Sequence, residues 1–134
     1  MKILFAASEA LPFIKVGGLG DVMGALPKEL VKQGIDARVV IPMYSVMSQK
    51  MREQCHFEKF FYFSLGWRSC YCGVFSAKAD GVTYYLIDNE QYFKRGGTYG
   101  EYDDAERFAY FSKAVLELLP QIDFFPDIIH ANDW

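Results

Sequence analysis

The stretch FIKVGGLGDVMGALP, residues 13–27, places a lone lysine and two adjacent glycines directly before a helical pattern. A glycine-rich start of a helix exposes backbone N–H groups at the positive end of the helix dipole, where they suit an anion. Lys15 adds a mobile charge on a long stem, which fits a diphosphate better than a carboxylate. The alternative is that Gly17 and Gly18 only permit an unusual turn, with Lys15 a solvated loop residue. Spacing alone leaves both interpretations open.

The residues around this stretch predict a strand, a helix and a second strand. KILFAAS, residues 2–8, is a nearly continuous apolar run, as expected of a parallel strand buried on both faces. DARVVIP, residues 36–42, has the same character. Between them apolar residues recur at helical spacing until Gly34: Leu19, Val22, Met23, Leu26, Leu30 and Val31. This order predicts a right-handed βαβ unit.

The middle of the chain predicts antiparallel structure instead. HFEKFFYFSLGW (residues 56–67) and SCYCGVFSAKADGVTYYLID (69–88) are rich in aromatic and β-branched residues, with breaks at Gly66 and at Asp80-Gly81. We expect a hairpin followed by a third strand that returns to the sheet. A glycine loop, KRGGTYGEYDD (94–104), leads into a long helix that Pro120 ends, and IIHANDW (128–134) begins another buried strand. The predicted fold class is therefore α/β.

Two common phosphate-binding motifs do not fit residues 13–27. A P-loop ends in Gly-Lys followed by Ser or Thr, whereas Lys15 precedes the glycines. The dinucleotide fingerprint needs a third glycine where Met23 stands, in a tight turn, whereas these glycines lie roughly ten residues past Ser8. The second strand also ends without an acidic residue to bind a ribose. A nicotinamide or flavin site is therefore disfavoured.

Composition excludes several classes of partner. The 134 residues carry a net charge of -3, which offers no broad basic surface for nucleic acid. No segment approaches ~18 consecutive apolar residues, so we expect no membrane span. Cys55, Cys70 and Cys72 are interpreted as free thiols in a reducing cytoplasm. The sequence has no Asp-x-Asp pair, and His56 beside Cys55 lacks a second ligand pair, so we expect no metal site.

KVGGLGDVMGALP resembles the N-terminal signature of bacterial glycogen synthases and plant starch synthases, usually Lys-Thr-Gly-Gly-Leu-Gly/Ala-Asp-Val. The resemblance spans essentially the whole chain, with DARVVIPMY, GGTYGEYDDAERFAYFSKAVLELL and PDIIHANDW following in the same order. Val16 replaces a common threonine and loses one possible hydroxyl contact. Asn132 stands where a second histidine is frequent, and it can still donate or accept hydrogen bonds.

This resemblance implies a two-domain GT-B glycosyltransferase with Rossmann-like domains. Such enzymes transfer glucose from ADP-glucose to the non-reducing end of an α-1,4-glucan such as glycogen, with retention of configuration and without a metal or cofactor. The chain would be the N-terminal portion, residues 1–134, of the N-terminal domain. The C-terminal nucleotide-binding domain would be absent, so we expect this piece to be inactive. The missing covering helix would leave apolar sheet exposed, which predicts self-association.

The resemblance also implies donor-binding roles for five residues. Lys15 would contact the donor phosphates, and Gly17 and Gly18 would let the backbone come close. Asp21 matches the aspartate of the signature, but a first-turn acid stabilised by the helix dipole is the simpler interpretation. Tyr99 matches a tyrosine near the donor; otherwise it is an exposed loop aromatic.

A second cluster follows the last predicted strand. The resemblance places Asp133 against the transferred glucose as a catalytic residue, and His130 beside it to orient the loop or touch ligand. The structural alternatives are a helix N-cap for Asp133 and a hydrogen-bonded strand-end histidine for His130. Trp134 is expected to pack.

Other polar and aromatic residues are expected to be structural. Asp103 and Glu106 have the spacing of an Asp-x-x-Glu cap before the long helix. Arg107 is expected to belong to the scaffold, and the aromatic run FEKFFYF to form the packed face of a hairpin rather than a glucan platform. Two functional alternatives stay open: a non-catalytic glucan- or nucleotide-binding module, and a related transferase that uses another nucleotide sugar.

Overall fold

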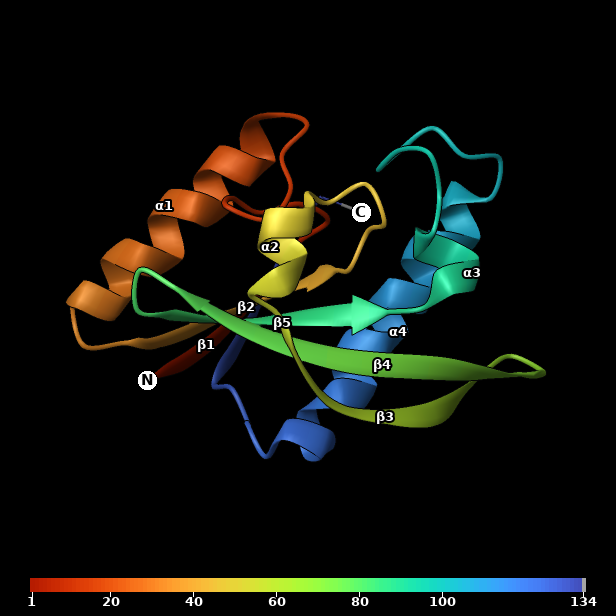
Figure 1. Cartoon of the computed structure of the whole chain (residues 1–134). Helices are drawn as coiled ribbons and strands as arrows, with labels where there is room; N and C mark the ends of the chain where they lie inside the picture. The colour runs from red at the N-terminus through yellow and green to blue at the C-terminus, as the bar shows by residue number, and fades with distance from the viewer. Residues whose placement is uncertain (134) are drawn as a thin grey trace.

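A computed structural model describes residues 1–133, and in this part of the chain one six-stranded sheet is flanked by helices on both faces (Figure 1). The strand order is β3-β4-β5-β2-β1-β6. The strands are β1 (Lys2–Ala6), β2 (Asp36–Pro42), β3 (His56–Leu65), β4 (Arg68–Ala79), β5 (Val82–Asp88) and β6 (Ile128–Ala131). The helices are α1 (Gly18–Lys32), α2 (Gln49–Glu53), α3 (Glu90–Phe93) and α4 (Asp104–Ile122).

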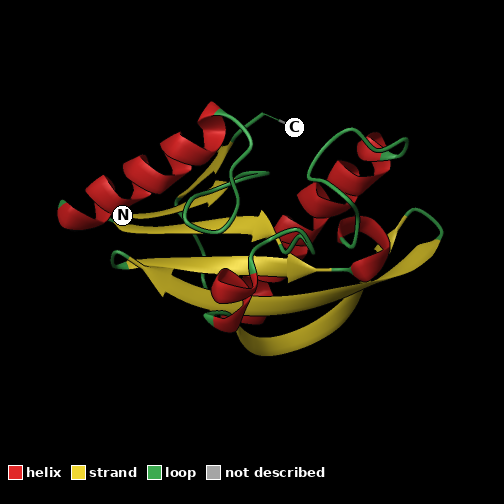
Figure 2. Cartoon of the chain, turned by 45° about the horizontal axis from the view of Figure 1, so that its top comes forward, coloured by secondary structure: helices red, strands yellow, loops and turns green. Residues whose placement is uncertain are grey.

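The sheet has a parallel core and an antiparallel excursion, as predicted. β1 pairs in parallel with β2 and with β6, and β2 pairs in parallel with β5. β3, β4 and β5 then form an antiparallel meander, in which β5 returns the chain to the core (Figure 2). The predicted βαβ unit, hairpin and returning strand are all confirmed.

The core lies in two layers because successive strand residues point to opposite faces of the sheet. On one face Leu4 and Val40 pack with the buried side of α4, including Phe111. On the other face Phe5 and Ile41 pack with α1. The predicted helical stripe of α1 is confirmed only in part, since Met23 is buried whereas Val22 and Leu26 are exposed.

Three expectations about local structure were wrong. Asp103 makes no side-chain cap bond; its carboxylate instead receives both Nη atoms of Arg95, at 2.8 and 2.9 Å. Glu106 accepts from Arg68 at 2.6 Å rather than from the helix start. α4 also continues through Pro120 to Ile122. In each case a long-range partner or tertiary packing outweighs the local signal.

The aromatic run of β3 does not form a single packed face. Phe61 and Phe63 pack toward α4, whereas Phe57, Phe60 and Tyr62 are exposed on the opposite side. Alternation separates Phe60 and Tyr62 from Phe61 and Phe63, and a β-bulge between Phe57 and Lys59 places Phe57 on the exposed side. The edge strand β6 is exposed along its length in the described structure, so the prediction that residues 128–134 begin a buried strand was wrong.

Candidate functional site

The loop between β1 and α1 is held by a buried carboxylate, Glu9. Its Oε2 atom accepts hydrogen bonds from the backbone N–H groups of Val16 at 2.7 Å and Gly17 at 2.9 Å. Glu9 is 4% exposed, and a buried carboxylate needs such donors to offset its lost hydration. The amide of Gly17, expected to approach a donor phosphate, is thus engaged in shaping the loop.

Gly18 and Gly20, which follow Gly17, have different structural roles. A Cβ on Gly20 would lie 2.9 Å from the Glu9 carboxylate and 2.9 Å from Cγ of Lys15, so only glycine fits there. Around Gly18, the first residue of α1, no atom of the described residues comes within 4 Å of an added Cβ. An anion can therefore approach the N-terminus of α1 at Gly18, where the helix dipole favours it.

Lys15 and Asp21 form an ion pair beside this open space. Lys15 Nζ lies 2.9 Å from Asp21 Oδ2, and the two side chains are 43% and 56% exposed. Such a solvated pair contributes little stability. The structure thus confirms Asp21 as a first-turn acid of α1 and places it against the lysine. A phosphate arriving at Lys15 would compete with Asp21 for the same cation.

Tyr99 reaches the same carboxylate from a distant part of the chain. Its hydroxyl donates to Glu9 Oε1 at 2.9 Å and lies 2.5 Å from Ser8 Oγ. Burial, together with the carboxylates of Glu9 and Asp133, raises the pKa of Tyr99 to about 12. The phenol therefore remains a proton donor at neutral pH, and Tyr99 is not merely an exposed loop aromatic.

Two arginines hold the Tyr99 loop in place. Arg107, fully buried in α4, donates to Thr98 O at 3.1 Å, to Tyr92 O at 2.7 Å and to Asp104 Oδ1 at 2.7 Å. Arg95 clamps the other end of the loop onto Asp103, and this guanidinium lowers the pKa of the Asp103 carboxyl. The expectation that Arg107 belongs to the scaffold is confirmed, and the acid it pairs with lies on its own helix.

The second predicted cluster lies at the end of β6. The ring of His130 packs on Phe5, with ring centroids 4.8 Å apart. Asn132 Nδ2 donates to Ala6 O at 3.1 Å and to His130 O at 3.0 Å, which confirms that asparagine can supply hydrogen bonds at this position. Asp133 is exposed, with φ of 58°. Trp134 lies outside the described residues.

The structure joins most of the predicted site residues through one residue that the sequence analysis missed. Glu9 links the loop of Lys15 and Gly17 to Tyr99, and Tyr99 in turn lies within electrostatic range of Asp133. The Lys15 loop follows β1 and Asp133 follows β6, at the carboxyl ends of parallel strands, where open α/β sheets bind ligands. Tyr99 reaches the same place from the loop between α3 and α4. In the sequence, the feature that points to Glu9 is its position directly after the buried stretch of residues 2–8.

The described residues contain no group of three His, Cys, Asp or Glu side chains arranged to hold a metal ion. No described helix is long and apolar enough to cross a membrane. The thiols of Cys55, Cys70 and Cys72 are unpaired in the described structure.

Comparisons with known proteins agree with this geometry. Residues 2–134 match the starch synthase catalytic domain family. Glycogen synthases of Bacillus cereus (strain B4264) and Clostridium botulinum (strain Alaska E43 / Type E3) are each 58% identical over the whole chain, which spans 28% of their length. The catalytic domain of starch synthase IV from Arabidopsis thaliana, bound to ADP and acarbose, superposes with a TM-score of 0.81 at 33% identity. That match covers 98% of this chain and 28% of the plant chain.

Proposed function

The chain belongs to the starch synthase catalytic domain family, and from this we propose that the full-length protein is a glycogen synthase. It transfers glucose from ADP-glucose to the non-reducing end of an α-1,4-glucan with retention of configuration. The observation that carries the proposal is the open N-terminus of α1 at Gly18, with Lys15 beside it. The ADP and acarbose of the plant relative support the donor and acceptor classes.

The leaving diphosphate is the chemical problem that this arrangement solves. As the bond to the sugar breaks, negative charge grows on the phosphate oxygens, and fixed donors that already point at them lower the barrier. Lys15 supplies a full charge, and the first amides of α1 supply partial charges. Glu9 and Tyr99 hold the loop in shape beforehand, so little reorganisation is needed during the reaction.

The sugar itself would be bound by the second cluster. Asp133 accepts hydrogen bonds from glucose hydroxyls or stabilises positive charge on the ring, and His130 orients the loop that carries it. Both follow β6, whose carboxyl end lies beside that of β1. The reaction needs no cofactor, because the nucleotide sugar is already activated.

The chain supplies one part of the catalytic cleft in this proposal. A C-terminal nucleotide-binding domain provides the remaining donor contacts, so the 134-residue chain alone does not transfer glucose. The free thiols are consistent with a cytoplasmic protein.

Transfer of labelled glucose from ADP-glucose and UDP-glucose, offered separately to the full-length protein with glycogen, tests the function. We expect kcat/KM to be much higher with ADP-glucose than with UDP-glucose. The label should enter non-reducing ends, from which an exo-amylase specific for α-1,4 linkages releases it. Incorporation from UDP-glucose alone would replace the proposed donor. No incorporation from either sugar, with glycogen still bound, would favour a non-catalytic module.

A further inference from the structure

β3 forms the edge of the sheet farthest from β6, and its outer side is open in the described structure (Figure 1). Residues 56–60 at its start are all exposed. An edge strand presents N–H and C=O groups without partners, and a strand of another chain can pair with them. The ten residues of β3 are at the upper end of ordinary strand length, whereas proteins often protect an edge by keeping it short.

One end of this edge is closed by α4. Lys113 Nζ donates a hydrogen bond to the backbone oxygen of Ser64, so this carbonyl points away from β4. In an antiparallel strand every second residue directs its backbone groups to the same side. The backbone groups of Tyr62 and Phe60 therefore point outward as well, which leaves them available to a further strand.

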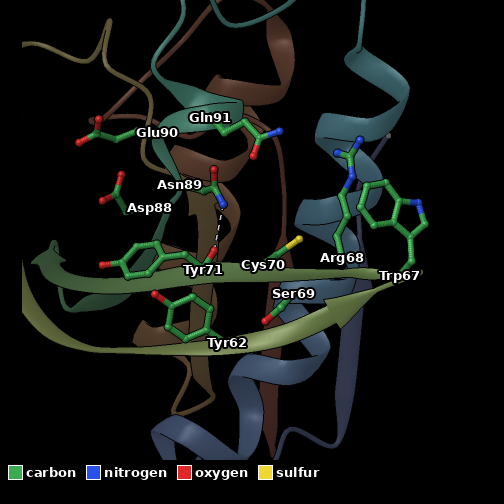
Figure 3. Close-up of a pocket in the computed structure, with 10 residues that line it drawn as sticks. All are labelled: Tyr62, Trp67, Arg68, Ser69, Cys70, Tyr71, Asp88, Asn89, Glu90 and Gln91. Carbon is green, nitrogen blue, oxygen red and sulfur yellow. Dashed lines mark hydrogen bonds between the residues drawn. The ribbon is translucent and has the colours of Figure 1, made fainter.

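The exposed rings of β3 gather on one face of the hairpin. Phe57, Phe60 and Tyr62 are 54%, 57% and 61% exposed. Phe60 stacks on Tyr71 with ring centroids 5.8 Å apart, and Tyr62 meets the same ring edge-on (Figure 3). Phe57 packs edge-on against Phe75 of β4 at 5.4 Å. A row of exposed rings beside an open edge is the kind of apolar patch that marks a protein–protein interface.

The charged residues of β3, Glu58 and Lys59, lie on the opposite face. Glu58 accepts a hydrogen bond from Ser76 Oγ at 2.6 Å, and Lys59 lies opposite Val74. Ser76 and Val74 are alternate residues of β4, so both lie on the face that packs against α4. The β-bulge thus places two adjacent residues of opposite charge on one face and the two phenylalanines that flank them on the other.

We propose that two copies of the protein associate through β3, with the two strands antiparallel about a two-fold axis between Glu58 and Lys59. In this register Glu58 of each copy lies opposite Lys59 of the other, and Phe57 lies opposite Phe60. Opposite charges and aromatic pairs across strands both stabilise an antiparallel pair. A shift by one residue would set each ring against a residue of the other face, so the register is specific.

The composition of this edge favours a second copy over other partners. The charges of Glu58 and Lys59 cancel, so the strand has no net charge to attract nucleic acid. A carbohydrate could pack on the rings, but it would leave the outward backbone groups of Phe60 and Tyr62 without a strand to pair with. A two-fold related copy uses the backbone, the rings and both charges at once.

Charge exchange in the full-length protein, followed by sedimentation equilibrium, tests the interface. We expect the weight-average mass of the unaltered protein to rise toward that of a dimer between about 1 and 100 µM, as for a small interface. Glu58→Lys or Lys59→Glu places like charges opposite each other twice, and each should weaken association roughly tenfold. The double variant Glu58→Lys with Lys59→Glu restores both attractions and should associate like the unaltered protein.

Lys78→Glu is the matched control, because Lys78 is an exposed lysine of the inner strand β4. It should leave association unchanged, and melting curves of all variants should coincide. Association of both single variants equal to that of the unaltered protein would overturn the proposal, as would a monomer at every concentration. A double variant that associates no better than the single variants would overturn the register. Association that appears only when maltoheptaose is added would assign the rings to carbohydrate and overturn the proposal as well.

Discussion

Glu9 determines the shape of the candidate site at the level of single residues. Its carboxylate accepts hydrogen bonds from two backbone amides and one phenol. The phenol belongs to Tyr99, which is 90 residues from Glu9 in the sequence. Because charged acceptors make strong hydrogen bonds in a buried setting, the Lys15 loop and the Tyr99 loop are coupled through this one group. Neither loop is held this way by its local sequence.

Replacing Glu9 with Gln should therefore loosen both loops. One oxygen becomes an N–H₂ group that cannot accept from Tyr99, and the remaining bonds lose their charge. We expect the free energy of unfolding to fall by about 1–2 kcal/mol in urea denaturation, and KM for the donor to rise in the full-length enzyme. Glu29→Gln, an exposed position on α1, should stay within about 0.5 kcal/mol. Equal stability of the two variants would contradict the role given to Glu9.

The sequence indicates several residues of the candidate site, but it does not show that Glu9 couples the Lys15 loop to the Tyr99 loop. Lys15, Gly18 and Asp21 could be found because they sit in one motif at the start of one helix. Glu9 could not, because a glutamate after a strand is ordinarily solvated, and only the tertiary fold shows that Tyr99 closes over it.

Among the secondary-structure elements, α4 connects the hydrophobic core to the site. It packs Phe108, Phe111 and Leu118 against the sheet and carries Arg107, whose guanidinium holds the carbonyl of Thr98 next to Tyr99. The apolar spacing predicted this helix well. The predicted cap did not form, because Arg95 and Arg68 reach Asp103 and Glu106 from other elements and outweigh a local bond.

Arg107→Lys should cost far more stability than a charge-conserving change usually does. Lysine cannot reach Tyr92 O, Thr98 O and Asp104 together, and it leaves buried acceptors without donors. We expect a loss of about 3 kcal/mol in chemical denaturation. Ser112→Ala, at an exposed position of the same helix, should change stability by less than about 0.5 kcal/mol. A cost for Arg107→Lys as small as that for Ser112→Ala would show that the clamp is dispensable.

In the hairpin of β3 and β4, the strands could be predicted from the sequence, but the side on which each aromatic ring lies could not. Aromatic content predicted β3 and β4 correctly, but a β-bulge between Phe57 and Lys59 shifts the alternation. The ring of Phe57 consequently lies on the exposed side with Phe60 and Tyr62 instead of with Phe61 and Phe63, which no local pattern in FEKFFYF reveals.

For the molecule as a whole, buried phenols set the response to alkaline pH. Burial is the main cause that raises the pKa of Tyr84, Tyr92 and Tyr99 from the ordinary 10.0 to about 12. Above pH 10 the unfolded chain loses these protons while the folded chain keeps them, so stability must fall as pH rises. We expect a flat melting temperature from neutral pH to about 9 and a steep decline between about 10 and 12. Tyrosinate absorbance that develops without loss of structure over that range would contradict this.

The exposed edge strand predicts the association behaviour of the isolated chain. Ile129 of β6 and Leu116 of α4 are exposed and line the same apolar cavity, and Ile128 is exposed on the opposite face of β6. Exposed apolar surface at a strand edge favours pairing between copies. The weight-average mass in sedimentation should rise with concentration, and Ile129→Lys should reduce this rise. A monomer at every concentration would contradict the prediction.

A comparison of two lysines of the full-length protein tests most directly whether Lys15 neutralises the departing diphosphate. Lys15 and Lys28 are 43% and 41% exposed, and each pairs with an aspartate, Asp21 or Asp80. Steady-state kinetics should show kcat/KM for ADP-glucose falling on the order of a hundredfold in Lys15→Ala, with glucan binding retained. Lys28→Ala should stay within about twofold of the unaltered enzyme. Equal kinetics for the two variants would contradict the account.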